Sequence, residues 1–270
     1  MKINTNLKAL GVAATMLTGF VVGGSATAFA EGGGGTEEGY NRSYNSSTVI
    51  EFQPFDGENS ITPPVDPTDP GNEINPEPEL PGGGDPGSGT NGPLSIDYAS
   101  SLSFGSPKIT STTQKYDVKP QTFKNRTPKE GPNYVQVTDN RGNGAGWTLQ
   151  VQQNGQFKTA KGEELGDGEE LKGARIIFND VWVNSNAQSN PATSPTSFDL
   201  KFNEDGTSVT ETVMSAKVGA GAGTYVLVFG DNSTAAKSIQ LEVPGTSTKY
   251  AKKYSTSLTW KLTDIPGKDA

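Results

Sequence analysis

The 270-residue sequence contains no cysteine and no histidine. The absence of histidine excludes a Ser-His-Asp triad and a Cys-His pair, and it also excludes zinc held by its usual ligands. The absence of cysteine excludes disulfides and any thiol that would carry a lipid anchor. An exported chain that is long enough to bury a core without disulfides favours an envelope that lacks an oxidising periplasm, as in Gram-positive bacteria.

Long apolar runs are also missing, except near the N-terminus. Two lysines precede a mostly apolar run at residues 10–22, and an A-x-A cleavage site ends at Ala30. This pattern predicts a secretory signal peptide over residues 1–30, because the run is too short to cross a membrane. We therefore expect a secreted protein that begins at Glu31, has no membrane span and has no covalent attachment to the cell.

Negative charge is concentrated in one part of the chain. Residues 31–93 contain 12 acids and one base, whereas residues 94–270 contain 18 acids and 19 bases. From Lys237 onward there are six lysines and three acids. This weakly basic end could face an anionic wall polymer, although a solvated strand face explains so small an excess more simply. We expect no nucleic-acid partner.

The first quarter of the mature chain, residues 31–93, has three predicted parts. Residues 31–45 are rich in glycine and glutamate, which predicts a flexible acidic leader. Residues 46–55 contain the apolar, β-branched stretch Val49-Ile50-Glu51-Phe52, which predicts a first strand packed on the main body. Residues 56–93 are rich in proline, glycine and aspartate. Because proline lacks an N–H, we expect a long disordered loop there that joins no β-ladder.

Residues 94–270 carry only strand signals. Apolar and polar residues alternate in several short segments, and others are continuously apolar: 94–98, 134–139, 147–153, 171–183, 198–202, 224–229 and 238–243. Residues 198–202 end in a tight turn and are predicted to form a hairpin with residues 207–213. No segment of ten or more residues has a helical period. We predict an all-β protein, either a single β-sandwich or a partly closed barrel.

One stretch stands out within this β body. Residues 140–146 consist almost entirely of turn residues, and they connect the strands predicted at 134–139 and 147–153. No Lys-Ser/Thr follows the glycines, so this connection is not a phosphate-binding P-loop. In the strand that follows, Trp147 and Leu149 share one face, and the same W-x-L spacing recurs at Trp260 and Leu262.

The remaining chemistry does not indicate an enzyme. Acids cluster at Glu163, Glu164, Asp167, Glu169 and Glu170, but they lie in a glycine-rich stretch rather than on opposite sides of a rigid cleft. We interpret this stretch as a solvated loop, with surface calcium binding as the alternative. We therefore expect no catalytic residue, no cofactor and no resident metal.

The three tryptophans leave two alternatives open. Each indole is either part of the sandwich core or an exposed plate that stacks on sugar rings. Trp182 lies in the most apolar stretch and is predicted to be purely structural. The exposure of Trp147 and Trp260 in the folded protein separates the two alternatives.

Two segments resemble the signatures of a known family. Residues 137–151, with the pattern D-x-R-G-x-G-x-G-W-x-L, resemble the first signature of the WxL-domain surface proteins of Gram-positive bacteria. Residues 254–264, with L-T-W-x-L-x-D, are similar to the second. The similarity covers about residues 46–270. The chain thus resembles the short members, which consist of a signal peptide and a WxL domain.

The resemblance implies non-covalent attachment to the cell wall through binding of peptidoglycan by the C-terminal domain. The residues that it marks as candidate peptidoglycan contacts are Trp147, Leu149, Trp260, Leu262, Asp139 and Arg141. It also implies an alternative, in which the chain is a protein-interaction subunit. A larger anchored surface protein, encoded with it, would then hold it at the wall, and the complex would contribute to adhesion.

Overall fold

In the computed structural model, the described residues are 44, 48–53, 55, 61–77, 87, 89–160, 165–187 and 191–267. The predicted signal peptide and almost all of the predicted leader lie outside them. The chain divides into two units, residues 1–50 and 51–270, and every described strand belongs to the second.

The described secondary structure is almost entirely β. A single three-residue 3-10 helix, η1 (Gly166–Gly168), accompanies the strands of the described residues. The strands are β1 (Val65–Asp66), β2 (Asp69–Glu73), β3 (Leu94–Ala99), β4 (Gln114–Asp117), β5 (Gln121–Thr122), β6 (Glu130–Gly131), β7 (Asn133–Asp139), β8 (Trp147–Gln153), β9 (Arg175–Phe178), β10 (Val181–Ser185), β11 (Phe198–Asp199), β12 (Glu211–Ala216), β13 (Gly223–Phe229), β14 (Ile239–Val243) and β15 (Leu258–Thr263).

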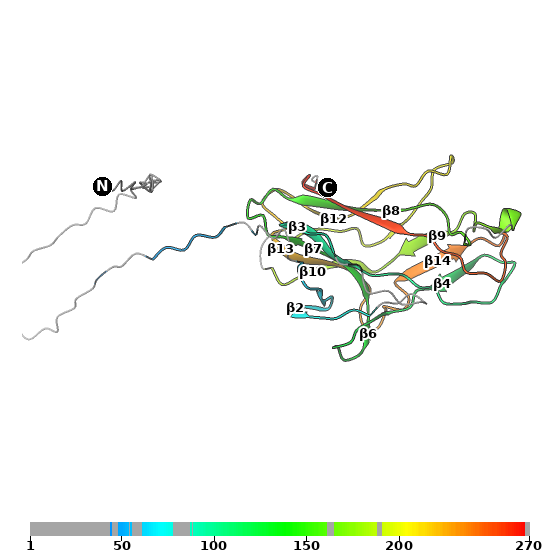
Figure 1. The fold of residues 1–270 in the computed structure, drawn as a ribbon, viewed down its shortest axis with the longest axis horizontal. Coiled ribbons are helices and arrows are strands. Elements are labelled where there is room, and N and C mark those ends of the chain that lie inside the picture. The colour runs from blue at the N-terminus through cyan, green and yellow to red at the C-terminus, as the bar shows by residue number, and fades with distance from the viewer. Residues whose placement is uncertain are drawn as a thin grey trace, which may run out of the picture. The chain divides into compact units, whose positions relative to one another are not determined.

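Three larger sheets enclose the main core. The central sheet has the order β10-β13-β7-β3, and the sheet β12-β8-β15 lies over one of its faces (Figure 1). A third sheet, β11-β9-β14-β4, extends the same core at one end of the body. The sheets pack face to face and do not close on themselves, which confirms the predicted all-β sandwich.

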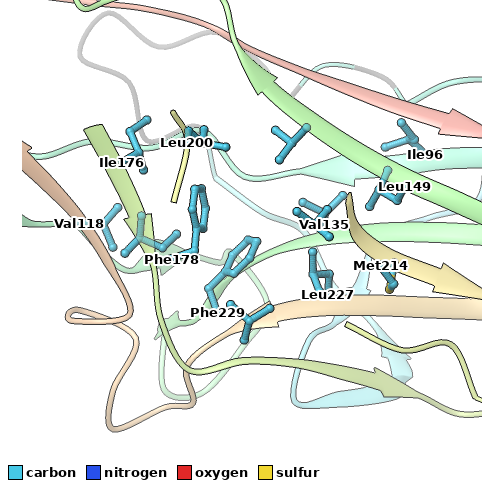
Figure 2. Packing of buried hydrophobic residues seen from close by; sticks show 14 of the residues in the cluster. Ile96, Val118, Val135, Leu149, Ile176, Phe178, Leu200, Met214, Leu227 and Phe229 are labelled. Carbon is cyan, nitrogen blue, oxygen red and sulfur yellow. The ribbon is translucent and has the colours of Figure 1, made fainter. Parts of the chain in front are cut away.

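The main core is built from the inward residues of these three sheets. Figure 2 shows Leu149 and Met214 of the upper sheet near Val135 and Leu227 of the central sheet. Near the third sheet the core side chains are aromatic, and the ring centroids of Phe178 and Phe229 are 4.9 Å apart. Branched and aromatic side chains thus fill the space between the sheets, as expected for alternating strands.

Strand β13 is buried on both faces. Tyr225, Leu227 and Phe229 point into the main core, whereas Val226 and Val228 belong to a second apolar cluster on the opposite face. The second cluster also contains Ile74, Tyr98, Phe123 and Tyr134. A strand covered on both sides needs apolar residues at successive positions. This explains the continuous apolar run at 224–229 and confirms its prediction as a buried strand.

The second cluster is covered by a segment that was predicted to be disordered. Strands β1 and β2 form an antiparallel hairpin within residues 61–77, so the disordered-loop prediction is wrong there. Proline lacks a donor, but its carbonyl still accepts: Gln136 Nε2 donates to Pro63 O at 3.0 Å, and Asn184 Nδ2 donates to Pro67 O at 2.9 Å. Residues 56–60, 78–86 and 88 of the predicted loop lie outside the described residues.

The predicted first strand is also wrong. Residues 48–53 are in no strand, and 85% of Phe52 is exposed, so this side chain does not pack on the main body. β-branched composition favours a strand only where a neighbouring strand is available to pair with it. Among the described residues, the β1–β2 hairpin supplies the first strands.

Pairing between residues 198–202 and 207–213 is only partly confirmed. The tight turn is present, with Asn203 N donating to Thr207 O at 2.8 Å and a single bridge between Phe202 and Ser208. Beyond the turn the two arms diverge, since β11 pairs with β9 and β12 pairs with β8. Sequence spacing identified the turn but not the sheets to which its arms belong.

Candidate functional site

The two W-x-L triplets lie on neighbouring strands of one sheet. In the antiparallel pair β8–β15, Leu149 is opposite Leu262 and Val151 is opposite Trp260. Trp147 is opposite Ala216 of β12, on the other side of β8. Residues directly opposite each other in an antiparallel pair point to the same face. Both triplets therefore turn their apolar side chains towards the main core.

Trp147 has no exposed surface. Its exposed fraction is 0%, its Nε1 donates to Gly221 O at 2.9 Å, and its ring meets Tyr225 edge-on at 5.9 Å between centroids. Leu149 beside it is equally buried. A sugar ring stacks only on an exposed aromatic face. Trp147 and Leu149 are therefore residues of the sandwich core and not an exposed plate for sugar rings.

The other two tryptophans are more accessible. Trp260 and Leu262 are half-buried, because β15 is an outer strand whose side chains pack on the main core from its margin. Trp182, on the outer strand β10, is 37% exposed, and its Nε1 donates to Gly230 O at 2.8 Å. Trp182 therefore has the most exposed of the three indoles, which does not agree with the prediction that it is purely structural.

Asp139 and Arg141 form an ion pair at the end of β7. Arg141 Nε donates to Asp139 Oδ1 at 2.9 Å and Nη2 donates to Asp139 Oδ2 at 2.8 Å. Nη2 also donates to Gly146 O at 2.8 Å, and the hydrogen bond to the carboxylate raises the pKa of Arg141. The side chains are largely buried. The bidentate pair closes residues 140–146 into a fixed loop ahead of Trp147.

The glycines of this loop meet a second glycine-rich segment. Gly144 and Gly146 have φ of 60° and 75°, and a Cβ on Gly146 would come 2.5 Å from Ala216 O. Gly219 N donates to Gly144 O at 2.7 Å. Only glycine combines this backbone conformation with so close an approach. These contacts of the first signature join β7, β8 and the turn after β12.

An open groove lies at the end of the body formed by the third sheet. It has a cavity volume of about 940 Å³, within the range of ligand sites. Its walls are the loop 102–109 on one side and the segment 249–256 on the other, with side chains of β4 and β14 between them. We call it the aromatic–lysine groove.

Aromatic and aliphatic side chains make up most of this groove, among them Phe104, Ile109, Tyr116, Phe157 and Tyr250. The rings of Phe104 and Phe157 meet edge-on at 6.3 Å between centroids, which ties one wall to the core. The opposite wall is fixed by hydrogen bonds: Tyr254 Oη donates to Gly168 O at 2.7 Å and accepts from Tyr250 N at 3.0 Å.

Among the described residues, the charged side chains that line the groove are all positive. They are the four lysines Lys108, Lys249, Lys252 and Lys253, and no described aspartate, glutamate, asparagine or glutamine lines it. Lys249 Nζ donates to two backbone carbonyls, Pro244 O and Ser247 O. The exposed Lys108 and Lys253 form no ion pair with any described residue. A cleft lined by one sign of charge attracts ligands of the other sign.

Only indirect signals for this groove are present in the sequence. The weakly basic C-terminal part contains three of the four lysines, at 249, 252 and 253. Lys108 and Phe104 come from a distant loop, and only the folded chain brings them near. None of the six candidate contacts predicted from the signatures lines the groove.

The described acids of the acidic stretch are held in separate ion pairs. Asp167 pairs with Lys172 at 2.9 Å, both exposed, and the half-buried Glu170 pairs with the exposed Lys158 at 3.0 Å. Glu163 and Glu164 lie outside the described residues. Within the part of the chain that the structure describes, no three acidic side chains gather to hold a metal ion.

The described strands form a β-sandwich domain with an open groove at one end. Its family follows from a comparison with family models: the model described as "WxL domain surface cell wall-binding" matches residues 39–266. The chain therefore belongs to the WxL-domain family and is a surface protein associated with the cell wall. Searches of curated proteins and of solved structures found no significant match. Among the described residues, no helix has the length and apolarity that crossing a membrane requires.

Proposed function

We propose that the protein attaches non-covalently to the cell wall by binding peptidoglycan, without catalysing a reaction, and that the aromatic–lysine groove is the contact surface. The observation that supports this most directly is the groove itself. It combines exposed apolar area with unpaired positive charge, at Tyr250, Lys108 and Lys253. Peptidoglycan offers both aliphatic groups and carboxylates to such a surface.

In this proposal the signature residues do not contact the ligand but stabilise the fold that positions the groove. The segment that carries one wall of the groove continues directly into β15, and Ser255 is fixed by paired backbone bonds with Lys158, at 2.8 and 2.9 Å. Trp260 and Leu262 then anchor β15 to the core. The pairing of β15 with β8 thus positions the groove wall relative to the rest of the sandwich.

Retention on purified peptidoglycan tests the proposal. We expect the wild-type chain to co-sediment with it and Tyr250→Glu to be lost, because the new carboxylate adds negative charge inside the groove. Val218→Glu is the matched control, since Val218 is exposed and lies outside the groove. Absence of wild-type retention would refute peptidoglycan binding. Release of soluble fragments by the pure protein would contradict the non-catalytic part.

A second candidate function is a protein-interaction subunit held at the wall by a larger anchored partner. The observation that favours it is the outer edge of β15, which among the described strands pairs with β8 alone. Such an edge can accept a strand from another protein. Surface localisation that disappears in cells without the partner, combined with no retention on purified peptidoglycan, would support this function over the first.

A further inference from the structure

The polar groups of the aromatic–lysine groove are unusual for a surface that binds sugars. Within the part of the chain that the structure describes, they are four ammonium groups and several hydroxyls, with no carboxylate or amide side chain. Hydroxyl-rich ligands are usually held by side chains that both accept and donate hydrogen bonds. Carboxylates and amides are the strongest hydrogen-bond acceptors among protein side chains. The groove is therefore rich in donors with full positive charge and poor in strong acceptors.

The apolar part of the groove indicates the rest of the ligand. Leu102 and Ile109 add accessible aliphatic surface between the rings. This surface suits methyl and methylene groups, which gain free energy when they leave water. A ligand that matches both features carries short aliphatic side chains and several carboxylates within the length of the groove.

From this complementarity we infer that the groove recognises the peptide stems of peptidoglycan, through their free carboxylates, rather than its sugar chain. The inference rests on the proposed function. In peptidoglycan the stems are short, rich in alanine and acidic, whereas the sugar chain offers mainly hydroxyls and amides. Lys108 and Lys253 contact the stem carboxylates from opposite walls, and the alanine methyl groups lie on the apolar floor between them.

Lys108 and Lys253 are the two groups that make the inference specific. They come from segments about 145 positions apart in the chain and face the same groove. Because neither has an acidic partner among the described residues, a ligand carboxylate displaces no existing ion pair. Binding should weaken as salt is added, since charge pairs at an exposed groove are screened.

The test compares three soluble fragments: muropeptides with intact stems, the same muropeptides after chemical amidation of their carboxylates, and sugar chains freed of stems by an amidase. We expect only the first to bind well. The double variant Lys108→Gln/Lys253→Gln should lose about tenfold in affinity for it. Lys124→Gln/Lys129→Gln is the matched control, with the same change of charge at exposed lysines outside the groove, and should bind as the wild type does.

With these fragments, the inference is overturned by equal binding of stem-free sugar chains, by equal binding of amidated stems, or by unchanged affinity of the groove double variant. Purified walls stripped of phosphate polymers by hydrofluoric acid provide a further arm. Loss of binding to stripped walls would identify phosphate as the anion and would overturn the stem as ligand. If wild-type protein stays on stripped walls but ignores stem carboxylates, the inference fails while peptidoglycan binding stands. If no fragment and no wall binds, both fail.

Discussion

Two regions of the molecule use similar residue types in opposite ways. In the first signature, the indole of Trp147 and the charges of Arg141 and Asp139 are turned inward and hydrogen-bonded within the protein. In the aromatic–lysine groove, Tyr250 and Lys253 are turned outward. The residues that mark the family in the sequence therefore stabilise the fold. The exposed groups that suit a ligand lie outside the two W-x-L triplets.

The largest expected effect comes from Trp147→Ala. Removing a fully buried indole should lower the free energy of unfolding by about 3–5 kcal/mol, because it leaves a cavity and an unpaired Gly221 carbonyl. Urea unfolding measures the change. At low temperature, where the variant is still folded, its affinity for peptidoglycan should equal that of the wild type.

Trp182→Ala is the control for Trp147→Ala. It removes the same side chain from an exposed position and should cost much less stability. A Trp147→Ala protein that is folded and stable but no longer binds would contradict the comparison, since Trp147 would then act on the ligand directly.

The next effect comes from Arg141→Met. It leaves the Asp139 carboxylate buried without its guanidinium, which should cost about 3 kcal/mol. Adding Asp139→Asn should recover part of this loss, because the unpaired charge is then gone. Unfolding free energies of the two single variants and the double variant form a cycle that gives the coupling energy. If the unfolding free-energy costs of the two single variants add up to that of the double variant, the Asp139–Arg141 ion pair does not stabilise the loop 140–146.

Much of the fold was predictable from local pattern. The alternation at 147–153 and the continuous apolar run at 224–229 directly indicate a half-covered and a fully buried strand, and both are found. What failed depended on distant partners. The hairpin β1–β2 exists because amides on β7 and β10 bond the carbonyls of Pro63 and Pro67, and no local pattern shows this.

The candidate site was less predictable for the same reason. The W-x-L spacing showed that Trp147 and Leu149 share a face, but an apolar strand face looks the same in sequence whether it meets a core or a sugar. The groove depends on Lys108 and Phe104 lying opposite the segment 249–256, a proximity that only the sheet order creates.

Asp97 provides a contrast to Asp139, because its donors are neutral. Ser95 Oγ and Thr138 Oγ1 each donate to its carboxylate at 2.6 Å, and Gln136 Nε2 donates at 2.9 Å. Burial raises the pKa of Asp97 above its ordinary 3.8, and these hydrogen bonds offset only part of the rise. The folded state therefore holds this proton more tightly than the unfolded state does.

The sign of the pH effect follows from that difference. The contribution of Asp97 is fully present below about pH 4 and is lost as the pH rises through the raised pKa, with a slope of at most about 1.4 kcal/mol per pH unit. Asp97→Asn should remove this slope. Urea unfolding of both proteins between pH 3 and pH 8, compared as a difference, checks it. A difference that does not change with pH would show that Asp97 titrates at its ordinary pKa when folded.

The smallest effect is expected where the two regions meet. Tyr254 begins the second signature and also lines the groove, and its hydroxyl joins Gly168 O to Tyr250 N. Tyr254→Phe keeps the ring but removes both hydrogen bonds, which should cost about 1 kcal/mol of stability. Because Tyr250 then loses its fixed position, affinity for peptidoglycan should also fall. Binding isotherms and urea unfolding measure the two quantities on one variant. If the variant loses stability but binds as the wild type does, Tyr254 contributes to the fold alone, as the inward-facing signature residues do. If it loses both stability and affinity, Tyr254 links the second signature to the position of the groove wall.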